Sequence, residues 1–268
     1  MYSTPDVPEI SPLELARAIE SGESVQLLDV RPAPMVESGR IDIVPDDRFL
    51  NIVGSQLMSI PSLDNTPLDP DVPVTVVCAH GISSQHVTQR LNELGGTARS
   101  LTGGMAAWMM TTLPRELTAI RSLDRLIQFD RIGKGALGYL LISNGEALII
   151  DPPMIAESFL DAAEDLDAKI VGVADTHVHA DYISGGPAMV TELGIPYYYY
   201  LHSLDGYYPY DGTPGRIEFT GLENGSTIRF GRCTVECRHT PGHTDGSTTY
   251  TVDGEAAFTG EHRTTGGR

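Results

Sequence analysis

Lysine is almost absent from this sequence, which has 36 acidic residues against 18 basic ones and a net charge of -18. Only Lys134 and Lys169 are lysines, so arginine supplies nearly all of the positive charge. A field of this sign repels nucleic acid and anionic membranes, which argues against a protein that binds either. We interpret the acidity as an adaptation for solubility.

Long hydrophobic runs are also missing. No apolar segment approaches the ~20 residues that a membrane span requires. The N-terminal residues MYSTPDVPEI have neither the basic nor the apolar part of a signal peptide. These absences predict a cytoplasmic protein.

Cysteine is sparse, with three residues at positions 78, 233 and 237. An odd and small number cannot build a disulfide framework, so the question is whether one thiol is reactive. Cys233 and Cys237 stand four apart on a predicted strand, and we expect both in the core. The chain of 268 residues is long enough for about two domains.

The first part of the chain has the pattern of an α/β domain. Ser11-Pro12-Leu13-Glu14 is a capping box with proline at the first helical position, which predicts a helix there. Val25–Val30 and Val74–Val77 are short apolar strands, and the second is expected at the centre of a parallel sheet. A helix, a strand at Ala98–Leu101 and a short helix with Trp108 follow, which makes a βαβ unit.

Cys78 begins the loop between the strand Val74–Val77 and the next helix. Backbone N–H groups and the positive end of a helix dipole stabilise a thiolate there, or the charged terminal sulfur of a persulfide. We expect Ser83 or Ser84 to cap the helix. A small buried hydrophobic role for Cys78 is the alternative at this stage. The loop that follows the cysteine has six residues: Ala79, His80, Gly81, Ile82, Ser83 and Ser84.

Residues 8–110 resemble a rhodanese domain. The resemblance lies in the opening helix, the Leu28-Asp29-Val30-Arg31 strand end, the Cys78 loop, and Leu101-Thr102-Gly103-Gly104 before Trp108. It implies that Cys78 is the nucleophile that carries sulfane sulfur. Many family members have arginine where this chain has Ser83. Without that cation an anionic donor such as thiosulfate is recognised less well, although His80 can supply part of the positive charge.

After a boundary that we predict near residue 118, short strands and tight turns dominate. Strands at 126–129, 138–142 and 147–150 are expected to form antiparallel hairpins. Helices near 155–166 and 186–193 flank a strand at 170–174. Further strands are predicted at 196–200, 226–230, 234–238, 248–252 and 256–258.

Histidines in this second part have the spacing of a metal site. His177 and His179 alternate with Asp181 along Thr176-His177-Val178-His179-Ala180-Asp181-Tyr182, at the end of a predicted strand. His243 lies in a turn after another strand, and Glu261 ends Phe258-Thr259-Gly260-Glu261. Two histidines with one carboxylate form the facial triad of Fe(II) enzymes, whereas more histidines favour zinc.

Residues 123–268 resemble the metallo-β-lactamase superfamily, in the branch of the persulfide dioxygenases. The segments that carry the resemblance are Ile132–Tyr139, Asp151-Pro152 and the Thr-His-x-His-x-Asp loop. The resemblance implies one iron held by His177, His243 and Glu261, with His179 and Asp181 as further ligands or as supports. Tyr182 replaces a ligand of the second metal found in two-zinc hydrolases. Glu261 replaces an aspartate and reaches one methylene further.

We therefore expect a rhodanese-like domain over residues 1–117 and a metallo-β-lactamase-like domain over 118–268, an α/β domain followed by a partial αββα sandwich. The predicted activity is Fe(II)- and O2-dependent oxidation of a low-molecular-weight thiol persulfide, with sulfane sulfur carried on Cys78. The first alternative is a degenerate or truncated member whose second domain is a non-catalytic scaffold or binding module and need hold no metal. The second is a zinc-dependent thioester hydrolase of the glyoxalase II kind.

The length of the second domain leads to an expectation about partners. A complete sandwich of this kind needs about 200 residues, and the sequence ends where its second half would begin. We expect this domain to be incomplete at its C-terminus. A homo-oligomer or a partner chain would then cover its open face.

Overall fold

The structure is a computed structural model of the 268-residue chain. It describes four stretches of the sequence: residues 5–118, 120–179, 183–200 and 219–260. Glu261 and Asp181, two predicted site residues, lie outside the described residues. Tyr182 lies outside them as well.

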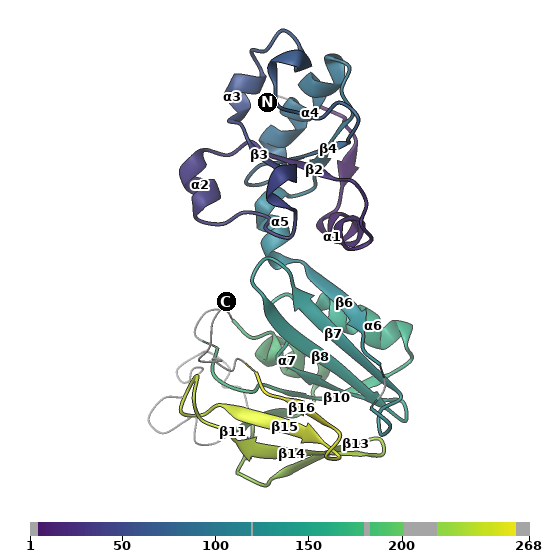
Figure 1. The fold of residues 1–268 in the computed structure, drawn as a ribbon. Helices are drawn as coiled ribbons and strands as arrows, with labels where there is room; N and C mark the ends of the chain where they lie inside the picture. The colour runs from purple at the N-terminus through teal and green to yellow at the C-terminus, as the bar shows by residue number, and fades with distance from the viewer. Residues whose placement is uncertain (1–4, 119, 180–182, 201–218, 261–268) are drawn as a thin grey trace. The chain divides into compact units, whose positions relative to one another are not determined.

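Two compact units make up the chain, and each is described by itself (Figure 1). The first unit is Met1–Leu113 with Arg131–Lys134. The second is Pro114–Asp130 with Gly135–Arg268. No described helix has the length and apolar content needed to cross a membrane.

The first unit is built on a five-stranded sheet in which every pair is parallel. Its strands, in spatial order, are β1 (Glu9–Ile10), β5 (Ala98–Leu101), β4 (Val74–Val77), β2 (Gln26–Asp29) and β3 (Phe49–Asn51). The β-branched strand β4 is at the centre, as its sequence predicts. All of the loops that leave the carboxyl ends of these strands therefore meet at one edge of the sheet.

Helices cover both faces of this sheet. They are α1 (Pro12–Glu20), α2 (Ala33–Glu37), α3 (Gly54–Leu57), α4 (Ile82–Glu93) and α5 (Gly104–Met110), with the 3-10 turns η1 (Asp46–Arg48) and η2 (Leu63–Asn65). One buried cluster joins the sheet to α1 and α5 and includes Trp108. Another joins the opposite face to α3 and α4. The predicted capping box is confirmed, since Ser11 Oγ accepts from Glu14 N while Glu14 Oε2 accepts from Ser11 N.

Two sheets form the second unit. The larger has the order β12 (Thr220–Leu222), β11 (Tyr197–Tyr200), β10 (Lys169–Ala174), β9 (Glu146–Ile150), β8 (Ala136–Ser143), β7 (Arg125–Arg131) and β6 (Thr112–Glu116). The smaller is antiparallel: β13 (Thr227–Phe230), β14 (Cys233–His239), β15 (Thr248–Val252) and β16 (Ala256–Phe258). The predicted hairpin between β8 and β9 is confirmed, with Asn144 and Gly145 both at positive φ in its turn. Strand β6 was not among the predicted strands.

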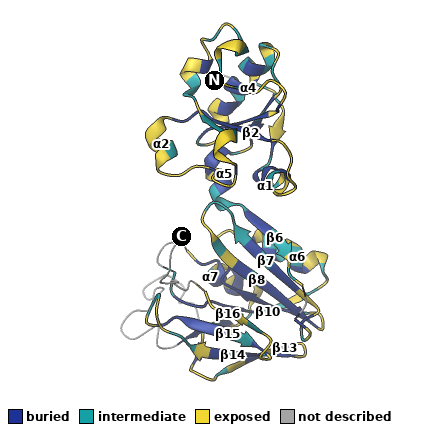
Figure 2. Ribbon diagram, in the orientation of Figure 1, coloured by how far each residue is buried: buried dark blue, intermediate teal, exposed yellow. Residues whose placement is uncertain are grey.

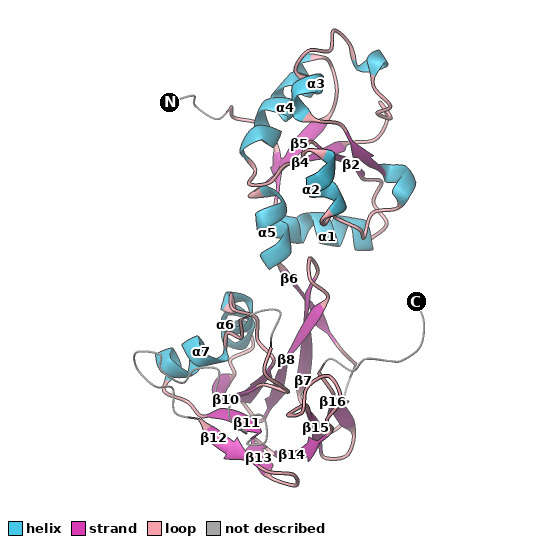
Figure 3. Cartoon of the chain, turned by 90° about the vertical axis from the view of Figure 1, so that its left-hand side faces the viewer, coloured by secondary structure: helices cyan, strands magenta, loops and turns pink. Residues whose placement is uncertain are grey.

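Alternating side chains of the larger sheet enter two different cores. Leu141, Leu148 and Ile150 face the smaller sheet, while Leu140 and Ile149 face α6 (Glu157–Asp165) and α7 (Gly186–Leu193). Figure 3 shows α6 and α7 on the same side of β8 and β10, and Figure 2 shows how deeply these strands are buried. The layer order, helices then sheet then sheet, is that of the predicted partial αββα sandwich.

Candidate functional site

Cys78 follows β4 directly and lies at the carboxyl edge of the parallel sheet, with 3% of its surface exposed. The chain turns through Gly81, whose φ of +80° is left-handed, and α4 begins at the next residue. A side chain at Gly81 would approach Gly103 N within 2.7 Å. This close approach explains why the loop needs glycine at that position.

The thiol sulfur accepts a hydrogen bond from Gly81 N at 3.1 Å and lies 3.2 Å from Ser84 Oγ. Burial raises the pKa of Cys78, but hydrogen bonds from the Ser83 and Ser84 side chains and from nearby backbone amides outweigh it. The net result is a pKa below the ordinary value. The environment therefore favours the thiolate, which is the nucleophilic form.

The expectation that Ser83 or Ser84 caps α4 is wrong. Gly81 is the N-cap residue and makes no side-chain cap bond. Ser84 lies instead within the first turn of the helix, fully buried, with its hydroxyl against the sulfur. Sequence patterns could not distinguish these roles, because a serine near a helix start commonly caps it.

The start of α5 holds the loop from the other side. Met105 N donates to Cys78 O at 2.9 Å, and Ala106 N donates to Ala79 O at 3.0 Å. At Gly104, a Cβ would come within 2.3 Å of Cys78 O. His80, Ile82 and Ser83 are exposed, so the outer rim of the loop is open to solvent.

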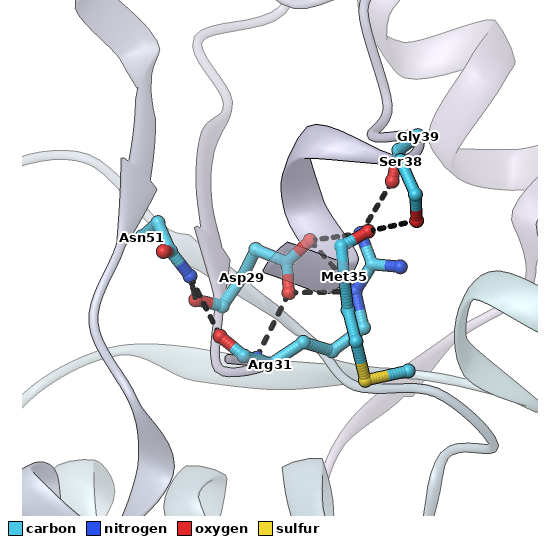
Figure 4. A network of polar contacts seen from close by, with 6 residues as sticks. All are labelled: Asp29, Arg31, Met35, Ser38, Gly39 and Asn51. Carbon is cyan, nitrogen blue, oxygen red and sulfur yellow. Dashed lines mark hydrogen bonds and ion pairs between the residues drawn. The ribbon is translucent and has the colours of Figure 1, made fainter. Parts of the chain in front are cut away.

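An ion pair fixes the neighbouring strand end (Figure 4). Arg31 donates from Nε and Nη2 to the buried carboxylate of Asp29, and from Nη2 to Gly39 O at 2.7 Å. Asn51 Nδ2 donates to the backbone oxygens of Asp29 and Arg31. The guanidinium of Arg31 is positively charged at ordinary pH, so it balances the negative charge of the buried Asp29 carboxylate on the strand next to β4.

Three histidines meet in the second unit. His177 and His179 follow β10, and their ring centroids are 4.2 Å apart. His243, from the turn between β14 and β15, has its ring centroid 4.8 Å from that of His177. Thr248 N donates to Thr176 O at 2.9 Å and ties the start of β15 to the histidine loop. The structure thus brings together the three described members of the predicted metal set.

Asp151, the residue after β9, contacts His179 directly and is linked to His177 through Thr176. Its Oδ1 lies 3.3 Å from His179 Nε2. Its Oδ2 accepts from Thr176 Oγ1 at 2.8 Å, and that hydroxyl lies 3.0 Å from His177 Nδ1. Since the hydroxyl proton is directed to Asp151, Thr176 accepts from His177 Nδ1. His177 Nε2 and His179 Nδ1 are then the basic nitrogens that a metal would use.

A second buried carboxylate, Asp175, lies beside Asp151 and His179. Ligand atoms of Asp151, Asp175 and His179 all fall within 4.8 Å of one another. Burial raises the pKa of Asp175 to about 6, even though His179 and Tyr197 act to lower it. Tyr197 Oη donates to Asp175 Oδ2 at 2.5 Å.

Asp151 belongs to the Asp151-Pro152 motif, for which no role was predicted, and no role was predicted for Asp175. Each directly follows a strand, β9 or β10, and these two strands lie side by side in the larger sheet. That placement was the signal that could have found them.

These residues fit a metal ion with imidazole ligands. The fixed tautomers direct basic nitrogens away from the carboxylates, and carboxylate-supported histidines are typical of metal sites. Imidazole nitrogens suit both Fe(II) and zinc, so the donors do not distinguish the two. Gly260 lies against this site, since a Cβ there would come within 2.4 Å of Thr176 Oγ1.

Cys233 and Cys237 lie in the core between the two sheets, as predicted. Burial raises the pKa of Cys237 to about 12. Of the tyrosine-rich segment, Tyr197–Tyr200 forms β11 and packs in both cores, and residues 201–218 lie outside the described residues.

A thiol held by backbone amides at the carboxyl edge of an α/β/α parallel sheet defines a class of sulfur-carrying domains. The family model "Rhodanese-like domain" matches residues 11–111. The putative sulfurtransferase YtwF of Bacillus subtilis is 32% identical over 110 residues, which cover 41% of this chain and 98% of that protein. The chain belongs to the rhodanese-like family through its first domain.

A further likeness is to the human protein "Persulfide dioxygenase ETHE1, mitochondrial", 31% identical over 118 residues that cover 43% of this chain and 42% of that one. The crystal structure of ETHE1 from Myxococcus xanthus has a TM-score of 0.38 and 25% identity, covering 55% of this chain and 56% of that one. The predicted combination of a rhodanese domain with a metallo-β-lactamase-like domain of this branch is confirmed. The chain spans 52%, 39% and 42% of the length of three further curated relatives, from Aquifex aeolicus, Crocosphaera subtropica and Bos taurus.

Proposed function

We propose that this chain is an enzyme of sulfur metabolism that carries sulfane sulfur on Cys78 and oxidises a thiol persulfide at the histidine site. The observation that carries the proposal is the Cys78 sulfur, held between Gly81 N and Ser84 Oγ. The same contacts suit a persulfide anion, because its terminal sulfur carries the charge that such donors stabilise.

The sulfur-transfer step needs no oxidant. The Cys78 thiolate attacks the outer sulfur of a persulfide R–S–SH. A bond forms between Sγ and that sulfur, the donor S–S bond breaks, and R–S⁻ leaves with the electron pair. A second thiolate then attacks the outer sulfur and returns Cys78 to its thiolate form. With Ser83 where a cation is common in the family, a neutral or weakly charged persulfide is a better donor than thiosulfate.

The oxidation balances as one persulfide R–S–SH with one O2 and one water, which give R–SH, sulfite and two protons. A bound Fe(II) would supply O2 binding and the electron transfer that this reaction needs. His177, His179 and His243 would hold it, with Glu261 as the carboxylate expected from the sequence. The role of Asp151 is to keep the histidine tautomers fixed, so that the basic nitrogens stay turned toward the metal.

The first test addresses Cys78 alone. The full chain is treated with glutathione persulfide, and the intact mass is measured. We expect a gain of about 32 Da, one sulfur atom, which reduction removes and which Cys78→Ser abolishes. The Cys237→Ser variant should still load. Loading that persists in Cys78→Ser would reject Cys78 as the carrier.

The second test addresses the metal. Purified protein is analysed for iron and zinc, and O2 uptake is followed with glutathione persulfide. We expect near-stoichiometric iron and uptake that His177→Ala abolishes, while His86→Ala, a change on α4 of the first unit, leaves both unchanged. Protein that binds no iron even after anaerobic loading would favour the scaffold alternative. Zinc with thioester hydrolysis would favour the hydrolase.

A further inference from the structure

A chain of buried hydroxyl groups leads from the neighbouring strand to the Cys78 sulfur. Ser100 Oγ, on β5, donates to Ser84 Oγ at 2.9 Å. Ser84 Oγ in turn lies 3.2 Å from Cys78 Sγ. Both serines are fully buried, with no exposed surface. The family motif in the loop accounts for Cys78 and its backbone cradle, but it does not account for Ser100.

The number of hydroxyl protons determines which group donates in each of these two hydrogen bonds. Each serine hydroxyl has one proton to donate. Ser100 gives its proton to Ser84 Oγ, so that oxygen already accepts a hydrogen bond and its own proton points elsewhere. A thiolate can only accept. Once Cys78 is ionised, Ser84 must therefore donate to Sγ, and the two hydrogen bonds run in one direction.

The backbone holds Ser100 in place independently of the sulfur. Ser100 N donates to Pro8 O at 2.9 Å, and β5 lies between β1 and β4 in the sheet. The strand pairing registers Ser100 opposite Val76, two residues before Cys78. A hydroxyl anchored in this way limits the rotation of Ser84 without depending on substrate.

We propose that Ser100 is a positioning residue for the Cys78 thiolate, acting through Ser84, whose O–H it holds on the sulfur. Hydrogen bonds in such a chain polarise one another, so the Ser100 bond strengthens the Ser84 bond. The lowered pKa of Cys78, to which the Ser84 side chain contributes, agrees with this arrangement. The proposal concerns sulfur transfer only if Cys78 is the sulfur carrier proposed above.

The test measures the thiolate directly and needs no sulfur donor, so it stands even if the proposed function fails. The rate at which iodoacetamide labels Cys78 in the full chain is followed against pH by peptide mass spectrometry. Without a donor, the thiolate loses stabilisation and the midpoint of the profile moves up. We expect a rise of roughly one pH unit for Ser84→Ala and about half a unit for Ser100→Ala. Ser100→Thr, which keeps the hydroxyl, should restore the original midpoint.

A matched control comes from the same helix. Thr88 is a fully buried residue of α4 whose Oγ1 has no hydrogen-bond partner in the described part of the chain. Thr88→Val removes a buried hydroxyl but leaves the hydrogen bonds from Ser100 through Ser84 to the sulfur unchanged. The pH midpoint of Cys78 labelling in this variant should equal that of the wild type. An equal shift in Thr88→Val and Ser100→Ala would mean that packing is the cause, and the proposal would be overturned.

The double variant gives the sharpest outcome. Because Ser100 acts only through Ser84, combining Ser100→Ala with Ser84→Ala should give the midpoint of Ser84→Ala alone. Additive shifts would show that Ser100 acts by a separate route and would reject the proposal. A Ser100→Ala profile that overlays the wild type would also reject it.

Discussion

Each unit buries a carboxylate at the carboxyl end of a strand, but the two carboxylates face different partners. Asp29 ends β2 and pairs with Arg31, two residues later, whose guanidinium stays charged at ordinary pH. Asp151 follows β9 and faces His179 and, through Thr176, His177, which are groups that can bind a proton or a metal. The first pair is internal to one loop and completes the fold, whereas the second depends on what the histidines bind. The comparison separates a carboxylate that supports structure from one that supports chemistry.

The largest expected contrast is between the cysteines of the two units. Burial raises the pKa of Cys237 to about 12, whereas the pKa of Cys78 is lowered. At pH 7 the thiolate fraction of Cys237 is then on the order of one in 10⁵. We expect iodoacetamide to label Cys78 at least about 1,000-fold faster than Cys237 in the native protein. Peptide mass spectrometry with and without urea checks this, and equal labelling under native conditions would contradict it.

The next effect concerns the ion pair of the first unit. Replacing Arg31 by alanine leaves Asp29 buried and without its cation, which should cost about 3–5 kcal/mol of unfolding free energy. The chain has one tryptophan, Trp108, buried in the first unit. Its fluorescence during urea unfolding therefore reports on that unit. Arg17→Ala, at an exposed position of α1, should change the value by less than about 0.5 kcal/mol.

A smaller effect is expected when the second carboxylate is changed. Asp151→Asn keeps the size of the side chain and the left-handed backbone but weakens the hold on both histidines. Metal affinity should fall by about 10- to 100-fold, measured by competition with a chelator. Asp167 has the same φ of 51° and is exposed away from these histidines. Unchanged affinity in Asp167→Asn, together with a loss in Asp151→Asn, would support a specific role for Asp151 at the histidines, and equal losses would contradict it.

The smallest effect separates stability from chemistry within the first unit. Ser11→Ala removes the N-terminal cap of α1 and should cost about 1 kcal/mol, again followed by Trp108 fluorescence. The pH midpoint of Cys78 labelling should not move, because α1 makes no contact with the sulfur loop among the hydrogen bonds of the described residues. A shifted midpoint would show that the loop responds to the stability of the whole unit.

Local patterns in the sequence predicted most of the fold. The Ser11 capping box, the β-branched strand Val74–Val77 and the Asn144-Gly145 turn each encode one element, and each was found where expected. Strand β6 was not predicted, because Thr112–Glu116 contains a proline and has no alternation. It pairs at the edge of a sheet, where such residues are tolerated.

The candidate site was predictable only in part, for the same physical reason. His177 and His179 are neighbours in sequence, so their common direction follows from the strand period. Asp151 meets His179 directly and His177 through Thr176 because β9 and β10 pair side by side. The contact of Ser100 with Ser84 joins strand β5 to helix α4. The packing of elements distant in sequence decides such contacts. The positions of Glu261 and Asp181, and the predicted partner chain or homo-oligomer, remain predictions.

The backbone at Asp151 has a consequence for how this site can change over generations. Its φ of 51° is readily adopted only by glycine, asparagine and aspartate. Of these three, aspartate alone brings a negative charge to both histidines. In related proteins that have lost the metal site, we therefore expect this aspartate to be replaced by asparagine or glycine and rarely by any other residue. The residue at the position of Asp151 in related sequences should therefore indicate whether selection still maintains the histidine site.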